Sequence, residues 1–199
     1  MSQRINCFIP YGDETQTKET ILNLKKDALV GKIYLLNAGE KGRCALEGCE
    51  VVDVPSLKNT EAMKKIAERA DADFTLLYTK ESKLEWVHFA LERMVNIAED
   101  SGAEMIYADH FNVIDGVRSF APVIDYQMGS LRDDFDFGSV LLYRTSAFKE
   151  AVSRMNINYQ FAALYDLRLK VSQKGVLEHM NEYLYYEVEM DTRKSGEKL

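Results

Sequence analysis

Short apolar runs alternate with stretches of helical periodicity through the first half of the chain. The runs at 5–10, 32–37, 49–54, 73–78 and 104–109 have the length of buried strands. Between them, apolar residues recur every three or four positions, as in 16–29 and 59–70, which is typical of amphipathic helices. Repeated strand–helix–strand units favour a parallel sheet with helices on both faces.

The second half departs from this alternation. Asp115-Gly116 stands between two strand-like pieces, which predicts a β-hairpin. The apolar residues from Leu84 to Ala98 predict one long helix before it. A strand is expected at 137–144, then two short helices, then two closing strands in the segments VLEHM and YLYYEVEM. We therefore expect a mixed, mainly parallel sheet in a single domain.

The charge balance limits the partners that we expect. With 25 Lys and Arg against 32 Asp and Glu, the net charge is −7, so nucleic acid is not expected. The first residues lack the apolar core of a signal peptide, and no run reaches the length of a membrane-spanning helix. The three cysteines lack a metal-binding pattern and are interpreted as free thiols, which predicts a cytoplasmic protein.

The order of several motifs resembles that of family 2 glycosyltransferases of the bacterial polysaccharide type. INCFIPYGD is similar to the family's opening strand and turn, and KIYLLNAGE to its second strand. MIYADHFNVIDGVRSFAPVIDY, FDFGSVLLYRTSAF and YDLRLKVSQKGVLEHMNEYLYYEV are similar to its hairpin, later strand and late helix with the closing strand. The resemblance implies a GT-A fold, which is a three-layer α/β/α architecture. It also implies a nucleotide-binding half at 1–109, an acceptor-side half at 110–190 and a polar tail at 191–199.

The resemblance implies a chemistry as well. Such enzymes transfer a sugar from a nucleotide diphosphate sugar to a saccharide or lipid-linked acceptor. Their diphosphate leaving group is usually stabilised by Mg²⁺ or Mn²⁺ on an Asp-x-Asp pair, and inverting members need a carboxylate base. Because strand ends converge at one edge of an open α/β sheet, the nucleotide is expected at Pro10, Tyr11, Asp13, Asn37, Tyr78 and Lys80.

This chain departs from the family's pattern at three carboxylate positions. The segment 78–81 reads Tyr-Thr-Lys-Glu where Asp-x-Asp is expected, Asn37 replaces a nucleotide-contacting aspartate, and Leu164 stands at the base position. We therefore expect metal dependence to be weak or absent, with Lys80 supplying positive charge to the diphosphate. The candidate metal ligands are Glu81 and Asp109.

Other carboxylates are candidates for the remaining roles. Asp109, at a strand end, and Asp166, at a helix start, are the candidate catalytic residues, with His110 beside the first. The candidate acceptor-side residues are Asp133, Asp134 and Asp136. Each group also has a purely structural explanation. Asp109 could cap a strand end, Asp166 could interact favourably with the helix dipole, and the acidic segment could be a solvated loop.

Two functional hypotheses stay open. The chain is either an active glycosyltransferase or a catalytically silent relative that binds nucleotide, sugar or a protein partner. A nucleotidyltransferase shares this type of sheet but needs a Gly-rich basic loop, where YGDETQTKET offers one glycine and one lysine. A flavodoxin-like module is disfavoured by the mixed second half.

Overall fold

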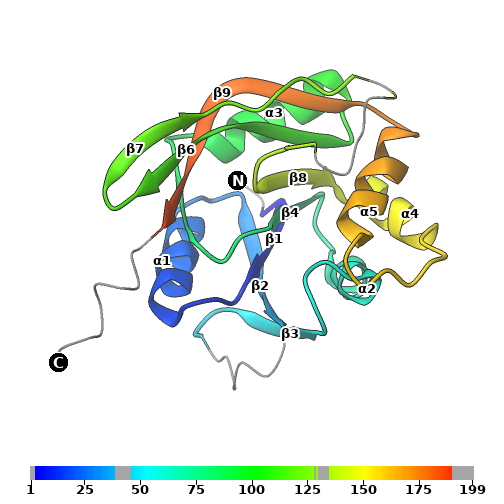
Figure 1. Cartoon of the computed structure of the whole chain (residues 1–199), viewed down its shortest axis with the longest axis horizontal. Coiled ribbons are helices and arrows are strands. Elements are labelled where there is room, and N and C mark those ends of the chain that lie inside the picture. The colour runs from blue at the N-terminus through cyan, green and yellow to red at the C-terminus, as the bar shows by residue number, and fades with distance from the viewer. Residues whose placement is uncertain (1–2, 39–45, 128, 130–134, 190–199) are drawn as a thin grey trace.

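The computed structural model describes residues 3–38, 46–127, 129 and 135–189. In this part of the chain, one sheet of nine strands runs through the molecule (Figure 1). Its order is β3-β2-β1-β4-β8-β6-β9-β5, and β7 pairs with β6 beside this path. The strands are β1 (Ile5–Pro10), β2 (Val30–Ala38), β3 (Glu50–Val54), β4 (Phe74–Tyr78), β5 (Lys83–Trp86), β6 (Met105–Ile114), β7 (Val117–Ala121), β8 (Val140–Arg144) and β9 (Leu177–Glu189).

Most of the strands run in the same direction. β1 is parallel to β2 and β4, β2 is parallel to β3, and β6 is parallel to β9. β8 is antiparallel to both of its neighbours, β4 and β6, and so joins the two parallel parts. β5 and β7 are further antiparallel additions. The mixed, mainly parallel sheet expected from the sequence is confirmed.

Helices cover both faces of this sheet. α1 (Glu14–Lys25) and α3 (Ala90–Ser101) pack on one face, where their apolar residues and those of the strands form one core. α2 (Thr60–Arg69), α4 (Thr145–Ser153) and α5 (Ala163–Ser172) enclose a second core on the other face (Figure 1). Because the central strands are covered on both sides, β1 and β4 are buried along their whole length.

Side-chain caps set where the first helices begin. The Asp13 carboxylate accepts a hydrogen bond from the Gln16 N–H at 3.0 Å, and Asn59 accepts one from Ala62 at 2.9 Å. Each cap satisfies a backbone donor that has no partner within the helix. Asp13 follows the end of β1 by three residues, so α1 starts beside the carboxyl edge of the sheet.

Three expectations about secondary structure are wrong. The strand predicted to end at Asp109 continues as β6 to Ile114. The predicted long helix begins only with α3, because 83–86 forms β5 and Phe89 has a left-handed φ of 59°. The two predicted closing strands form one continuous strand, β9. Where a break was predicted, the pairing of β9 with β6 shifts its register between Ala108 and His110. The predicted hairpin is confirmed, since 115–116 joins β6 to β7.

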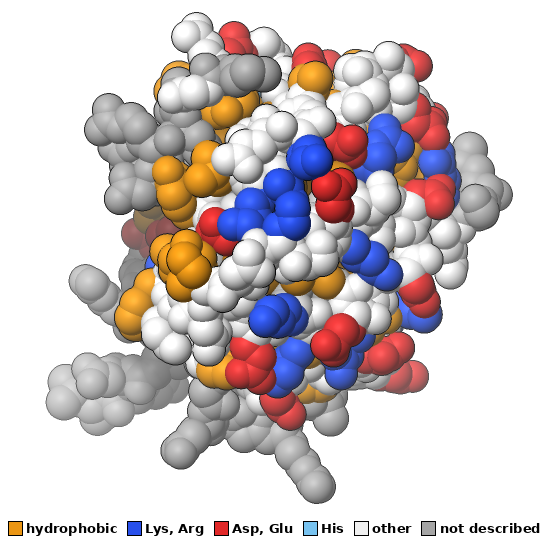
Figure 2. Space-filling view, turned by 90° about the vertical axis from the view of Figure 1, so that its right-hand side faces the viewer, with side chains coloured by type: hydrophobic (Ala, Val, Ile, Leu, Met, Phe, Trp, Pro, Cys, Tyr) orange, Lys and Arg blue, Asp and Glu red, His pale blue; other side chains and the backbone are white. Residues whose placement is uncertain are grey.

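Charges of both signs are distributed over the surface. Figure 2 shows the side that lies at the right in Figure 1, where Lys and Arg side chains lie among Asp and Glu. Ion pairs such as Lys65 with Glu61 are exposed and contribute little to stability, so the fold rests on its two cores. No helix in the described residues is long and apolar enough to cross a membrane.

Candidate functional site

The carboxyl ends of β1, β2 and β4 meet at one edge of the sheet. Pro10 of β1 pairs with Leu36 of β2, so Asn37 lies one residue beyond that level. The pairing of β1 with β4 places Tyr78 beside the same end of β1. Open α/β sheets bind their ligands outside this edge. Four residues that the sequence assigned to the nucleotide belong to this edge: Pro10, Tyr11, Asn37 and Tyr78.

Two loops at this edge are in close contact. A Cβ atom on Gly12, in the β1–α1 loop, would lie 2.7 Å from the Cβ atom of Glu81, in the β4–β5 loop. Only glycine permits this approach without displacement. The Tyr11 N–H donates to the Leu36 carbonyl at 2.9 Å, which continues the pairing of β1 with β2 into the loop. The first loop therefore has a fixed path along the edge.

Asn37 presents an amide at the end of β2. Its Nδ2 donates a hydrogen bond to Asp53 of β3 at 2.8 Å. Its Oδ1 is buried and has no hydrogen-bond partner among the described residues. Most buried polar atoms in folded proteins are paired, so this amide keeps one unused acceptor beside the predicted nucleotide position.

Lys80 follows the end of β4 and forms an ion pair with Glu187 of β9. The lysine side chain is 48% exposed, whereas the glutamate side chain is 2% exposed. The Ser139 hydroxyl also donates to this carboxylate, and His110 Nε2 lies 3.2 Å from its Oε1. A buried carboxylate needs such partners. Lys80 is therefore a half-exposed cation that a buried group holds in position.

The His110 ring is packed against Tyr185 and close to Gly138. It stacks on Tyr185 with 5.0 Å between ring centroids. A Cβ atom on Gly138 would collide with the Tyr185 hydroxyl and lie 3.4 Å from His110 Nδ1. Burial lowers the pKa of His110 below its ordinary value of 6.5, against the opposing effect of the Glu187 carboxylate. The neutral ring can donate its Nε2 proton to Glu187.

Asp109 is committed to internal contacts. Its Oδ1 accepts a hydrogen bond from the Val123 N–H at 2.9 Å and lies 2.8 Å from His179 Nε2. The other ring nitrogen of His179 lies 2.6 Å from Asp125. These contacts fasten the segment after β7 to β6 and β9. Asp109 lies within β6 and not at the strand end that the sequence predicted, so it is not a strand-end cap. Its contacts account for it as a structural residue that ties these segments together.

Asp166 lies in the first turn of α5 and is 6% exposed. Lys170, one turn later, donates to its Oδ1 at 2.5 Å. Its Oδ2 is buried and has no hydrogen-bond partner in the described part of the chain. The Ala163 N–H donates to the Lys58 carbonyl, which places the start of α5 against the start of α2. The carboxylate is thus paired with a lysine and keeps one unused oxygen.

The candidate metal ligands are held apart by their local contacts. Glu81 lies in the loop against Gly12, whereas Asp109 is bonded to β9 through His179. In the ranges that the structure describes, no group of three or more His, Cys, Asp or Glu side chains is placed to hold a metal ion. A hard cation such as Mg²⁺ takes several oxygen ligands, so these residues do not fit one.

The acidic loop before β8 is described only in part. Asp136 accepts a hydrogen bond from the Gly138 N–H at 2.8 Å. Asp133 and Asp134 lie outside the described residues. The sequence did not predict the other residues that surround His110. The one available signal was a glutamate within the aromatic strand segment YLYYEVEM. The missed residues are Ser139, Tyr185 and Glu187.

The strand order, the helices on both faces and the loops at the carboxyl edge define a fold of the glycosyltransferase type. The chain is similar to the crystal structure of TarS 1-349 of S. aureus, with a TM-score of 0.63 and 11% identity over 93% of this chain and 60% of that one. The same fragment in complex with UDP-GlcNAc gives a TM-score of 0.62 and 10% identity over 94% and 59% of the two chains. Its complex with UDP gives a TM-score of 0.60 and 11% identity over 93% of this chain and 60% of that one.

The chain therefore spans about three fifths of the length of these TarS structures. At this level of identity, the likeness shows the fold alone. No protein-family model matches the chain, and no curated protein matches it.

Proposed function

We propose that the chain is a glycosyltransferase-type protein, related to family 2, that binds a nucleotide diphosphate sugar at the carboxyl edge of its sheet. The observation that carries this proposal is Lys80, a half-exposed cation held at the end of β4 by buried Glu187. A fixed ammonium group can stabilise the charge of a diphosphate. The TarS complexes with UDP and UDP-GlcNAc, which have the same fold, support this choice of ligand.

The neighbouring residues of the edge would recognise the rest of the nucleotide. Asn37 offers its unused carbonyl oxygen as an acceptor for an N–H or hydroxyl group. The loop of Tyr11 and Gly12 keeps a fixed path against Glu81, so its backbone presents a preformed wall. Preformed sites lose less conformational entropy when the ligand binds.

We propose that this binding does not depend on a divalent cation. The family's usual Mg²⁺ or Mn²⁺ site needs several carboxylate or other oxygen ligands. The segment at the end of β4 offers Glu81 directly after Lys80, and the ammonium group would repel a cation. Lys80 then takes over the electrostatic role of the metal.

The reaction that we propose is displacement at the anomeric carbon, with a saccharide or lipid-linked acceptor, in the cytoplasm of a bacterial cell. A second candidate function is nucleotide-sugar binding without transfer. It is favoured by Leu164 at the expected base position and by the pairing of Asp166 with Lys170, because neither arrangement supplies an evident proton acceptor.

Calorimetric titration with UDP tests the proposal. We expect saturable binding in EDTA, with an affinity that changes less than about threefold when Mn²⁺ is added, a difference well below the 1.4 kcal/mol of a tenfold change. Strong binding only with Mn²⁺ would contradict the role given to Lys80. The absence of binding in both conditions would contradict nucleotide recognition itself. Release of free sugar from UDP-GlcNAc then separates transfer chemistry from binding alone.

A further inference from the structure

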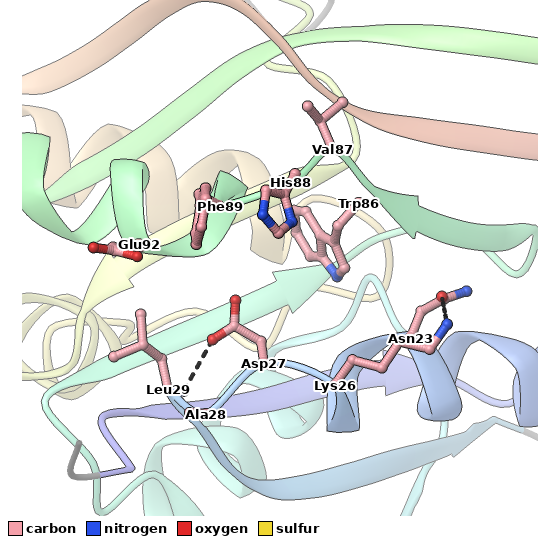
Figure 3. Close-up of a pocket in the computed structure, with 10 residues that line it drawn as sticks. All are labelled: Asn23, Lys26, Asp27, Ala28, Leu29, Trp86, Val87, His88, Phe89 and Glu92. Carbon is pink, nitrogen blue, oxygen red and sulfur yellow. Dashed lines mark hydrogen bonds between the residues drawn. The ribbon is translucent and has the colours of Figure 1, made fainter.

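A cavity of about 390 Å³ opens away from the carboxyl edge of the sheet. Its walls are the end of α1, the turn into β2 and the turn between β5 and α3 (Figure 3). Leu29 in this wall directly precedes β2, and Asn37 lies near the other end of that strand, so the two regions are roughly 25 Å apart. None of the residues that we assign to the nucleotide lines this cavity.

Aromatic side chains form one wall of the cavity. His88 lies between Trp86 and Phe89 in Figure 3, and its ring centroid is 3.8 Å from that of Phe89. Phe89 is 58% exposed although it is a large hydrophobic residue. Exposed aromatic faces that line a hollow are typical of ligand sites, because they offer a large rigid contact area.

The backbone of Phe89 is strained in a way that positions its ring. Its φ of 59° lies in the left-handed region, which bulky residues rarely adopt. Phe89 is the N-cap of α3, but its side chain makes no capping hydrogen bond. Glycine would occupy this conformation without a steric cost. A strained residue that is not a glycine, and whose side chain does not cap its helix, indicates a function for the side chain that it presents.

Polar groups face the aromatic wall. One oxygen of Asp27 accepts a hydrogen bond from the Leu29 N–H at 2.9 Å, and the other points toward the rings in Figure 3. The Asn23 amide lies farther along the wall, where its Oδ1 accepts a hydrogen bond from Lys26 Nζ at 3.1 Å. Trp86 Nε1 is buried and has no hydrogen-bond partner within the described ranges. The cavity thus combines hydrogen-bond acceptors and donors with aromatic faces.

This combination fits a neutral saccharide. A pyranose ring has a face of C–H groups that packs on aromatic rings, and its hydroxyl groups bond to amides and carboxylates. The carboxylates of Asp27 and Glu92 disfavour a phosphate or another anion, and the Lys26 ammonium group disfavours a cation. We infer that the cavity between α1 and the β5–α3 turn is a saccharide-binding site, separate from the nucleotide edge. This inference goes beyond the proposed function and does not depend on it.

Trp86 is the only tryptophan of the chain, so its fluorescence reports on this cavity. The experiment titrates the full chain with maltotetraose and chitotetraose, and separately with tetramethylammonium as a cationic probe. We expect a saturable change of emission with at least one oligosaccharide, with a Kd on the order of 1 mM. No response to either oligosaccharide, or a response to tetramethylammonium alone, overturns the inference.

Two variants assign the response to the cavity. Phe89→Gly removes the ring and relieves the backbone strain, so the variant is expected to fold. We expect it to bind the oligosaccharide at least about tenfold more weakly. Phe161, which is 80% exposed and does not line the cavity, provides the control Phe161→Ala, with unchanged affinity. Equal affinity in Phe89→Gly and the wild type overturns the inference. Calorimetry of UDP binding to the Phe89→Gly variant tests the nucleotide edge independently. The saccharide site and the nucleotide site can therefore be refuted separately.

Discussion

The half-exposed ammonium group of Lys80 is held by the buried carboxylate of Glu187, 107 residues away in the sequence. The pair joins the end of β4 to β9 across the carboxyl edge of the sheet. One partner is accessible to a ligand and the other is not, so the buried carboxylate can fix the direction of the exposed charge. A pre-oriented cation stabilises an anion without the cost of ordering a free lysine side chain.

Replacing Lys80 should weaken nucleotide binding. We expect Lys80→Ala to lower the affinity for UDP about tenfold, because one charge-assisted contact to the diphosphate is lost. The matched control is Lys32→Ala. Lys32 is also half-exposed and ion-paired, with Asp71, but it lies at the amino-terminal end of β2. Equal UDP affinities of the two variants by calorimetry would remove Lys80 from the site.

Asp109 should contribute to stability and not to nucleotide binding. We expect Asp109→Ala to reduce the free energy of unfolding by about 1–3 kcal/mol, because the buried Val123 N–H and His179 lose their acceptor. Asp125→Ala provides the control. It removes the other partner of His179, but Asp125 is 72% exposed, so its loss should cost about 0–1 kcal/mol. Urea denaturation measures both values.

UDP titration of a milder variant, Asp109→Asn, separates the structural role from a catalytic or metal-binding one. The amide oxygen can still accept the hydrogen bond from Val123. We therefore expect unchanged UDP affinity. A large loss of affinity in a variant of normal stability would place Asp109 in the nucleotide site.

Gly138 should resist substitution more than Gly116. Both glycines have a left-handed φ, 72° and 78°, so alanine carries a similar backbone cost of about 1 kcal/mol at each position. At Gly138 the new Cβ atom would also collide with the Tyr185 hydroxyl, whereas at Gly116 no atom lies within 4 Å. We expect the Gly138→Ala protein to be the less stable of the two in urea denaturation. Equal stabilities would show that Tyr185 and His110 can move to accommodate the new Cβ atom at little energetic cost.

His110 should make stability fall as the pH falls. Its pKa is lowered in the folded chain by burial, with Glu187, Asp136 and Asp109 opposing this effect and Lys80 adding to it. Below pH 6.5 the unfolded chain therefore binds a proton that the folded chain does not, and folding loses stability. One such proton is worth at most about 1.4 kcal/mol per pH unit.

The variant His110→Gln isolates this effect, since glutamine can donate to Glu187 but does not titrate. We expect its free energy of unfolding to depend less steeply on pH than that of the wild type between about pH 7 and 5. Denaturation series at several pH values give the two slopes. Identical slopes would mean that His110 takes up a proton equally well in the folded and unfolded chains.

The sheet could be predicted from the sequence because its signals are local. Apolar runs such as 5–10 and 74–78 are buried on both faces, so their pattern alone shows strands. The helix predicted from Leu84 failed because the spacing of apolar residues is the same whether Leu84 faces inward from a strand or from a helix. A short turn at 87–89, with a left-handed backbone at Phe89, separates β5 from α3, and no residue type in it predicts this turn.

The candidate site was less predictable because its contacts are long-range. The predicted strand ends and a turn that contains glycine were enough to predict the edge of the sheet where Tyr11 and Asn37 lie. The partner of Lys80 could not be predicted, since it depends on the register between β5 and β9. The same holds for Asp109, whose acceptor role depends on His179, 70 residues later.

An NMR titration of the isotopically labelled chain with UDP, without added metal, tests nucleotide binding at the carboxyl edge most directly. We predict saturable shifts of the backbone amides at Tyr11, Asn37 and Lys80, with those of His88 and Phe89 unchanged. Shifts confined to the turn between β5 and α3, or no shifts at about 10 mM UDP, far above the Kd of a specific nucleotide site, would contradict the proposed function.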